Sequence, residues 1–548
     1  MISTRPHSTH PPERRQKHLP FARRRLITLL ALLVGVLLRL LQYAVDRSLW
    51  LDEALLSEST LTRGWVDLLL VPLEYGQTAP PGFLLLQKLA TTLLGGGEPA
   101  LRLVPLLAGL AALLWFPAVA RRYISRGAVP LATALFALAP FLVYYSSEAK
   151  QYSTDALAAL AVLWAAAELR RAPTRRAFVA AAATGAAAAW ISQPAIFVMA
   201  GVGLVLGFEG LRQGNRHRTA ALAAVGAAWI AAFAGAYLLS RRSLGDPEYM
   251  RAFWSAGFPD GVVWWPRMVA RLFREPLGVV GEDPTPLSDV HQLAAALAFA
   301  LGAAWMVRRG RGVRLALLLA PAGLALAAAT LRLYPFAATY TTSGRLLLFL
   351  LPALALVVAQ GVAAASAWIG GTRGRAAGMV LAMALLASPL FYAAVQVPHL
   401  RAEVKPVLEY AAENRQPGDL LYVHYAGRAP FRYYADRFGW TAGNSVVGRC
   451  SRPDPRGYLD ELQGVADRRL WVLFVDDRAT SNHDDRGLIL AYLEHRGQRV
   501  DDQVSVGAAV YLYDLRLPAA SAGPFAPRIP TFAATPTVAC RGPWANDG

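Results

Sequence analysis

The chain has 548 residues, of which 55% are hydrophobic and only 17% are charged. Soluble globular domains carry more charge, about 25%, so this composition excludes an ordinary soluble domain and predicts a membrane protein. The net charge of +18 raises the question of a nucleic-acid partner. The basic residues, however, sit in short clusters between long apolar runs and not on one polar face, so we predict no nucleic-acid partner and interpret the clusters as topology determinants.

The first predicted element follows a polar, basic stretch at residues 1–25. Residues 26–45 are almost entirely apolar, and about 20 apolar residues suffice to span a bilayer. We find no small-residue cleavage site that would mark a signal peptide. The pattern predicts an uncleaved spanning helix whose N-terminus lies in the cytoplasm.

An outer loop is predicted at about residues 46–101. Within it, residues 83–94 form an apolar segment that is too short to span. Two prolines precede this segment and three glycines follow it. We expect a helix that lies on, or dips into, the outer face of the membrane.

Ten further apolar segments are long enough to be spans, which makes eleven with the first. They are residues 103–120, 128–145, 154–168, 177–193, 195–211, 219–239, 291–307, 313–331, 346–368 and 376–396. Alternate loops carry clusters of arginine, and the cytoplasmic side of a membrane protein is the side enriched in Lys and Arg. These arginines are Arg121, Arg122, Arg126, Arg170, Arg171, Arg175, Arg176, Arg212, Arg216, Arg218, Arg308, Arg309, Arg311, Arg314, Arg373 and Arg375. The predicted fold class is mainly α, polytopic and transmembrane with about eleven spans over residues 26–397, in the inner or plasma membrane, with a second outer loop at about 240–290.

With a cytoplasmic N-terminus, an odd number of spans predicts that the C-terminal region lies on the extracytoplasmic side. Short apolar runs at residues 420–425, 470–475 and 508–513 predict strands, and residues 404–414 and 487–496 predict helices. We therefore expect an extracytoplasmic α/β domain over residues 398–517 and a Pro/Ala-rich tail over 518–548. This region has neither G-x-G-x-x-G nor a P-loop, so nothing marks it as nucleotide-binding.

The chain contains two cysteines, Cys450 and Cys540. In an oxidising compartment they are candidates for a disulfide. Two unpaired thiols are the alternative, because sequence spacing does not show proximity.

The candidate site begins with SLWLDEA, where Asp52 and Glu53 follow the first span. Ionisable residues at a membrane boundary are costly and are functional candidates by default. A solvated acidic loop is the alternative. Other polar residues from separate outer loops face the same predicted side: Gln77, Arg102, Glu148, Lys150, Tyr152, Asp155, Arg332, Tyr334 and Arg345. A carboxylate can accept a proton from an attacking hydroxyl, while Arg and Lys can bind a phosphate and stabilise its charge.

Five stretches carry a resemblance to a known family. They are LWLDEA, QTAPPGFLLLQKL, ALRLVPLLAGL, SSEAKQYSTDAL and RLLLFLLPALALVVA. In order and spacing they resemble the glycosyltransferase C superfamily, in the polyprenyl-phosphate-sugar-dependent branch that includes protein O-mannosyltransferases and aminoarabinose transferases. The resemblance covers about residues 26–400.

The resemblance implies transfer of a sugar, with inversion, from a polyprenyl-phosphate donor to an extracytoplasmic glycan, lipid or protein acceptor. By motif, Asp52 is the general base and Glu53 its neighbour or substitute. Glu148 and Lys150 shape the site and hold the donor, and Arg345 binds the lipid phosphate. Arg102, Tyr152 and Gln77 are further candidates for binding substrate. Gln77 and Thr78 stand where an aminoarabinose transferase has a lysine, which leaves the sugar and the acceptor open.

Alternatives remain for several of these residues. Lys150 and Arg345 are equally typical of cationic side chains that snorkel at helix ends. Trp264 and Trp265 fit an interfacial aromatic anchor better than a sugar platform. The nine histidines show no metal-binding spacing, so no obligatory metal is predicted, with a divalent cation on Asp52 and Glu53 as the alternative.

Two other functions compete with that of a glycosyltransferase. A transporter or flippase of a lipid-linked precursor is the first, and it would more naturally show internal repeats and polar residues near the bilayer midplane. A sensor with an outer ligand-binding domain is the second, but it leaves the charges at the membrane face unexplained.

Overall fold

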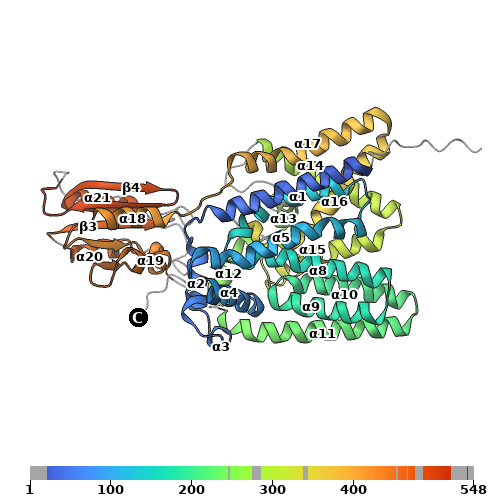
Figure 1. Ribbon diagram of the computed structural model, residues 1–548, viewed down its shortest axis with the longest axis horizontal. Helices are drawn as coiled ribbons and strands as arrows, with labels where there is room; N and C mark the ends of the chain where they lie inside the picture. Colours follow the sequence, from blue (N-terminus) through green and yellow to red (C-terminus); the bar gives the residue numbers. More distant parts are fainter. Residues whose placement is uncertain are drawn as a thin grey trace, which may run out of the picture.

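The computed structural model describes residues 21–244, 247–274, 286–336, 343–451, 454–465, 467–475, 485–519 and 540. Most of the predicted N-terminal stretch and of the Pro/Ala-rich tail lies outside the described residues, as do parts of the outer loop at 240–290. The described chain forms a large helical part and a small sheet domain at one end of it (Figure 1). The predicted fold class is confirmed.

Each of the eleven predicted spans coincides with a helix or a run of two helices. These are α1 (Phe21–Ala44), α5 (Glu98–Tyr123), α6 (Val129–Leu138) with α7 (Pro140–Tyr144), α8 (Tyr152–Arg171), α9 (Arg175–Ile191), α10 (Ala195–Arg212), α11 (Arg216–Ser240), α14 (Pro286–Arg308), α15 (Gly312–Thr330), η5 (Ser343–Leu350) with α16 (Leu351–Ile369), and α17 (Gly371–Val395). Within the described residues, eight helices are long and apolar enough to cross a membrane, or nine if a bent pair counts as one span. Helices α8 and α9 are not among them, because α9 has only 17 residues and α8 carries charged residues at both ends. The chain is a multi-pass membrane protein, and the count of eleven stays a prediction.

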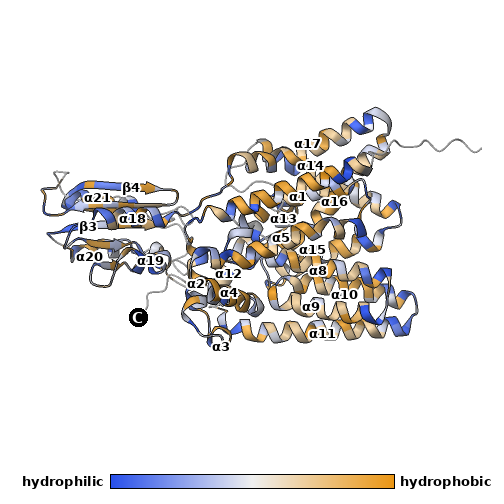
Figure 2. Ribbon diagram, viewed as in Figure 1, coloured by the Kyte–Doolittle hydropathy of each residue, from blue (hydrophilic) through white to orange (hydrophobic). Residues whose placement is uncertain are grey.

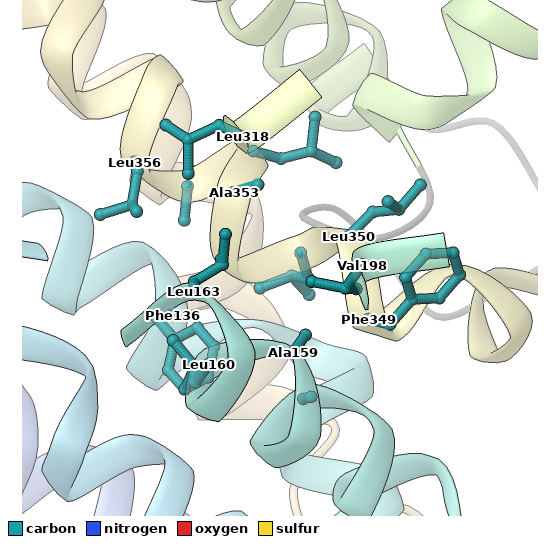
Figure 3. Close-up of a cluster of buried hydrophobic side chains, with 14 of the residues drawn as sticks. Phe136, Ala159, Leu160, Leu163, Val198, Leu318, Phe349, Leu350, Ala353 and Leu356 are labelled. Carbon is teal, nitrogen blue, oxygen red and sulfur yellow. The ribbon is translucent and has the colours of Figure 1, made fainter. Parts of the chain in front are cut away.

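Helix α16 lies at the centre of the bundle. Most of its side chains are buried, and they pack on Phe136, Leu160, Leu163, Val198 and Leu318 from the surrounding helices (Figure 3). Two glycines let α14 and α16 cross closely, since a Cβ on Gly361 would lie 1.6 Å from the carbonyl oxygen of Ala298 and one on Gly302 would lie 2.1 Å from that of Val357. Small residues at helix crossings are typical of membrane interiors, where packing replaces the hydrophobic effect.

The two ends of the helical bundle differ in their charged loops. Figure 2 shows hydrophilic helix ends and loops at the end of the bundle away from the sheet domain. The arginine clusters between α8 and α9 and between α10 and α11 belong to this end. The short helices α2 (Leu51–Thr62), α3 (Asp67–Leu70), η1 (Glu74–Gly76) and α4 (Pro81–Leu94) lie at the opposite end, beside the sheet domain (Figure 1). This arrangement agrees with the positive-inside bias.

A buried arginine supports the break between α6 and α7, which are bent by 58°. Pro140 has no N–H, so the carbonyl oxygen of Phe136 loses its helical partner. Arg39 of α1 is fully buried and donates from Nη1 to the carbonyl oxygens of Gly35 and Ala137, both at 2.9 Å, and from Nη2 to that of Phe136 at 3.5 Å. In lipid every backbone polar group needs an internal partner, so Arg39 stabilises the bend that leads into residues 145–150.

We expect Arg39→Met to destabilise the folded protein by about 2 kcal/mol or more, because it leaves two carbonyl groups without donors inside the bilayer. Thermal unfolding in lipid nanodiscs measures this change. Arg25→Met, at an exposed position of the same helix, is the matched control and should unfold like the wild type. An Arg39→Met protein that is as stable as this control would contradict the role given to Arg39.

Two further helices lie in the loop before α14, which the sequence predicts to be an outer loop. They are α12 (Pro247–Phe253) and α13 (Trp264–Arg274). Trp264 is buried and donates its indole N–H to the carbonyl oxygen of Ala256, whereas Trp265 is 36% exposed. Only Trp265 is therefore placed where an interfacial anchor could reach the surface.

The C-terminal domain is a five-stranded sheet with helices on both faces. The strands are β1 (Leu420–Val423), β2 (Ser445–Val447), β3 (Arg469–Val475), β4 (Gln498–Ser505) and β5 (Ala508–Asp514), in the order β2-β1-β3-β5-β4. Strands β2, β1 and β3 are parallel, and β5 is antiparallel to β3 and β4. Helix α18 (Val404–Asn414) packs on one face, and α20 (Arg456–Gln463) and α21 (Asp485–Arg496) pack on the other. Cys450 and Cys540 form a disulfide, with their Cα atoms 5.5 Å apart.

Candidate active site

The loop before α2 is held by the C-terminal domain. The backbone N–H and the hydroxyl of Ser48 donate to Glu403 Oε2 at 3.0 and 3.1 Å, and the N–H of Leu49 donates to the hydroxyl of Tyr434 at 2.8 Å. The Lys405 ammonium lies 2.9 Å from Glu98 Oε1 and 3.0 Å from Asp46 Oδ2. The sheet domain therefore fixes the start of the helix that carries both candidate carboxylates.

Glu53 is fully buried and its two oxygens are fully engaged. Arg47 Nη1 donates to Oε2 at 2.8 Å, and Arg102 donates to Oε1 from Nε and to Oε2 from Nη2, both at 2.8 Å. The N–H of Ala149 donates to Oε1 at 2.8 Å. Burial alone would raise the pKa of Glu53, but the charges of Arg102 and Arg47 lower it to about 2. A carboxylate held this way fixes three segments together and has no oxygen left to take up a substrate proton.

Arg102 takes part in the same network. Its Nη1 and Nη2 also donate to the carbonyl oxygens of Arg47 and Ser48, at 2.7 and 3.1 Å. The N–H groups of Arg102 therefore bind Glu53 and the loop before α2, and they are not directed at the phosphate of a sugar donor. Arg47 was missed by sequence reasoning, although it stands in the same RSLWLDEA stretch. It also donates from Nη2 to the carbonyl oxygen of Ser147 at 2.9 Å.

Asp52 lies in a different environment from its neighbour. Its Oδ2 accepts a hydrogen bond from Arg345 Nη1 at 2.7 Å, and its side chain remains 21% exposed. Burial opposes ionisation, but the charges of Arg345, Lys150 and Arg401 outweigh it and lower the pKa of Asp52. Asp52 is therefore an ionised, partly accessible carboxylate surrounded by cations.

Arg345 joins the late span to this site. Its guanidinium lies 5.6 Å from the ring centroid of Tyr152 and 5.7 Å from that of Trp254. Its Nε is buried without a hydrogen-bond partner among the described residues. Arg345 thus has a donor to spare for an incoming anion.

Lys150 and Gln77 meet directly. Lys150 Nζ donates to Gln77 Oε1 at 2.6 Å, and Lys150 is 5% exposed. Burial lowers the pKa of Lys150, while the charge of Asp52 acts in the opposite direction. The predicted residues Asp52, Arg345, Lys150, Gln77 and Tyr152 therefore come together from four separate segments of the chain, Lys150 and Tyr152 from the same one.

Arg401, in the segment that leads to the C-terminal domain, is a second residue that the sequence did not mark. Its guanidinium stacks over the Trp50 ring, 3.1 Å from the centroid, and its charge contributes to the lowered pKa of Asp52. Arg401 stands three residues before the stretch VKPVLEYAAENRQPGD, and this position is the sequence feature that could have pointed to it.

The remaining candidates lie at the edge of the site or away from it. Asp155 is 4% exposed inside α8, and the hydroxyl of Tyr334 donates to the carbonyl oxygen of Leu346 at 2.8 Å. Arg332 is exposed in the turn after α15. Within the described ranges, no group of three or more His, Cys, Asp or Glu residues could hold a metal ion.

Comparison with solved structures gives membrane-protein matches of low identity. ArnT from Cupriavidus metallidurans in the apo state is 15% identical with a TM-score of 0.49, and the match covers 90% of this chain and 98% of ArnT. ArnT bound to undecaprenyl phosphate gives the same values. The oligosaccharyltransferase of Archaeoglobus fulgidus in the apo form is 13% identical with a TM-score of 0.48, over 89% of this chain and 74% of that protein. Family models and curated proteins give no match.

Glu148 is a third acidic group of the site, after Asp52 and Glu53. It is fully buried, and neither carboxylate oxygen has a hydrogen-bond partner among the described residues. Burial, reinforced by the negative charge of Glu53, raises the pKa of Glu148 from 4.5 to about 7. Near neutral pH this carboxyl therefore exchanges between its neutral and charged forms.

The raised pKa of Glu148 predicts a pH-dependent stability. A carboxyl that binds its proton more tightly in the folded protein contributes fully below its unfolded pKa of 4.5, and the contribution is lost as the pH rises through about 7. We expect the wild type to lose stability between pH 6 and 8, and Glu148→Gln to be more stable than the wild type at pH 8 by up to about 3 kcal/mol. Unfolding midpoints in nanodiscs at pH 6, 7 and 8 measure this, with Glu413→Gln at an exposed site as the control. The idea fails if Glu148→Gln shows the wild-type pH dependence.

Proposed function

We propose that this protein is a membrane glycosyltransferase that moves a sugar from a polyprenyl-phosphate carrier to an acceptor hydroxyl on the extracytoplasmic side. Asp52 is the general base. Arg345 and Lys150 bind the donor phosphate, with Gln77 and Tyr152 beside them. The arginine clusters at the opposite end of the bundle support an outward-facing site and a cytoplasmic N-terminus.

The observation that carries the proposal is the contact between Asp52 Oδ2 and Arg345 Nη1 at 2.7 Å. It brings one accessible carboxylate beside a cation with a spare donor, at the end of the bundle that faces the sheet domain. Glu53, the adjacent carboxylate, is tied to Arg47 and Arg102. Asp52 is thus available for proton transfer, whereas Glu53 stabilises the structure of the site.

The proposed reaction is a single displacement. The acceptor hydroxyl passes its proton to Asp52 as its oxygen bonds to C1 of the donor sugar. The bond between C1 and the phosphate oxygen breaks, and the polyprenyl phosphate leaves with the electron pair. Arg345 and Lys150 stabilise its negative charge. Attack opposite the leaving group inverts the configuration at C1.

Donor binding would also prepare the base. In the described structure Arg345 shares its charge with Asp52. A phosphate that takes over the Arg345 guanidinium would weaken this ion pair and make Asp52 more basic. Binding and activation are then linked through one arginine.

The direct test is transfer by the purified protein in lipid nanodiscs. The probes are radiolabelled polyprenyl-phosphate sugars that differ in the sugar, with membrane extract as the source of acceptors. We expect label from one donor to appear on an acceptor. If no donor supports transfer but labelled carrier crosses the bilayer of a proteoliposome, the protein is a flippase and the proposal is wrong.

Replacing Arg345 with Ala should raise the donor KM by about 10- to 100-fold, because it removes a charge-assisted contact worth about 1.5–3 kcal/mol. Folding should change much less than donor use. Arg332→Asn is the control, since Arg332 is exposed at the same end of the bundle and Asn tolerates its positive φ of 54°. An unchanged donor KM in Arg345→Ala would argue against a phosphate contact at this residue.

A further inference from the structure

A cavity of about 470 Å³ lies between the membrane part and the C-terminal domain. Its walls are α2, the turn at residues 96–98 and helix α19 (Arg428–Tyr434), which meet at the junction in Figure 1. Cavities of about 300–1,000 Å³ are typical of sites for small molecules. The lining residues on the membrane part are Ala54, Glu58, Leu61, Thr62, Gly96, Gly97 and Glu98.

This cavity is separate from the Asp52 site. Successive residues of an α-helix are 100° apart, so the lining residues Ala54, Glu58 and Leu61 share a face of α2 that points away from Asp52. Asp52 itself contacts Arg345 of the membrane part. The same helix therefore presents the proposed base on one face and the cavity on the other.

The charged groups of the cavity balance one another. Glu58 and Glu98 lie opposite Arg432 and Arg437, and the ion pairs are long, 3.7 Å between Arg432 and Glu58 and 3.8 Å between Arg437 and Glu98. The arginine side chains are 46% and 58% exposed. Glu98 is also bound by Lys405 at 2.9 Å, and the second partner of Lys405 is Asp46, at 3.0 Å. The carboxylates and cations around the cavity are therefore equal in number, which favours a neutral ligand that both accepts and donates hydrogen bonds. The many hydroxyl groups of a saccharide meet this description.

Two further features fit a built site. Tyr75 has a positive φ of 57°, a strained conformation for a tyrosine that points to a functional constraint. Its hydroxyl donates to Glu58 Oε2 at 2.9 Å and accepts from Arg432 Nη1 at 2.6 Å, so it orients one carboxylate and one guanidinium at the cavity. The turn at residues 96 and 97 consists of glycines, and a Cβ on Gly97 would meet only Pro99, at 3.7 Å. The wall therefore has open space at Gly97, whereas a Cβ on Gly96 would lie 3.1 Å from the side chain of Leu61.

We propose that this junction cavity is a second saccharide-binding site. It takes sugar hydroxyls through Glu58, Arg432 and Arg437. The saccharide is either a remote sugar of an extended acceptor, a reading that rests on the proposed transferase function, or a separate sugar that binds α2 independently of transfer. Both sources share the same chemistry.

Saturation-transfer NMR on the full chain in nanodiscs tests the site directly. The probes are the methyl glycosides of glucose, galactose, mannose and N-acetylglucosamine. We expect at least one glycoside to receive saturation from the wild type, and Gly97→Leu to abolish the signal by filling the cavity. Arg437→Ala should weaken binding about tenfold, as expected for loss of one hydrogen bond to a charged group. Because this exposed arginine pairs loosely with Glu98, its removal should leave folding intact even if Gly97→Leu does not fold.

Controls separate this site from the catalytic one. Arg449→Ala, at another exposed arginine of the same domain, should bind like the wild type. Asp52→Asn should keep glycoside binding even though the proposed chemistry is removed. No glycoside signal from the wild type, or equal signals from the wild type, Gly97→Leu and Arg437→Ala, would overturn the proposal.

Transfer kinetics then identify the source of the sugar. If Arg437→Ala raises the acceptor KM while the donor KM stays unchanged, the cavity holds part of the acceptor. If glycoside binding weakens and the acceptor KM does not change, the cavity binds a separate saccharide. Glycoside binding without any transfer by the wild type would support the cavity while rejecting the transferase function.

Discussion

Asp52→Asn should reduce sugar transfer by about 10²- to 10⁴-fold, the usual contribution of a general base. An amide cannot take up the proton of the acceptor hydroxyl. Its carbonyl oxygen can still accept the hydrogen bond that Arg345 Nη1 donates to Asp52 Oδ2. The variant should therefore fold and bind donor while transfer fails.

The measurement is single-turnover transfer with the donor that the wild type uses, together with donor binding by the same preparations. Asp67→Asn is the matched control, because Asp67 is an exposed carboxylate at the start of a short helix in the same loop between α1 and α5. Normal turnover by a well-folded Asp52→Asn protein would remove Asp52 from the role of base. A loss of donor binding that accounts for the whole defect would instead make Asp52 an orienting partner of Arg345.

The membrane helices could be predicted from sequence because their signal is local. Each span is a continuous apolar run, and each arginine cluster lies between two such runs. The strand β4 was missed because it has no apolar run of its own. Its sequence QRVDDQVS is polar because it forms the edge of the sheet, paired only with β5, and a polar edge strand resembles a loop.

The roles of the two adjacent carboxylates could not be predicted, because they depend on contacts between distant segments. Asp52 meets Arg345 across 293 residues, and Glu53 meets Arg102 across 49 and Ala149 across 96. The motif located both carboxylates at the membrane boundary. It did not show that successive positions at the start of α2 direct one side chain to Arg345, where it stays partly exposed, and the other into a closed network.

Glu53→Gln is the prediction that separates the two carboxylates most sharply. The change leaves the buried arginines Arg47 and Arg102 without their counter-charge, since their side chains are only 1% and 2% exposed. Removing one partner from a buried ion pair typically costs about 3–5 kcal/mol. We expect a fall of this size in the free energy of unfolding, with poor recovery of folded protein.

Denaturant-induced unfolding in lipid or detergent, followed by tryptophan fluorescence, measures this loss. Glu74→Gln is the control, because the Glu74 side chain is 52% exposed in its pair with Arg63 and exposed pairs contribute about 1 kcal/mol or less. If Glu53→Gln were as stable as this control but inactive in transfer, Glu53 would have a chemical role that its closed hydrogen-bond network does not suggest. Loss of stability in Glu53→Gln together with loss of transfer alone in Asp52→Asn would establish that one residue builds the site and its neighbour performs the proton transfer.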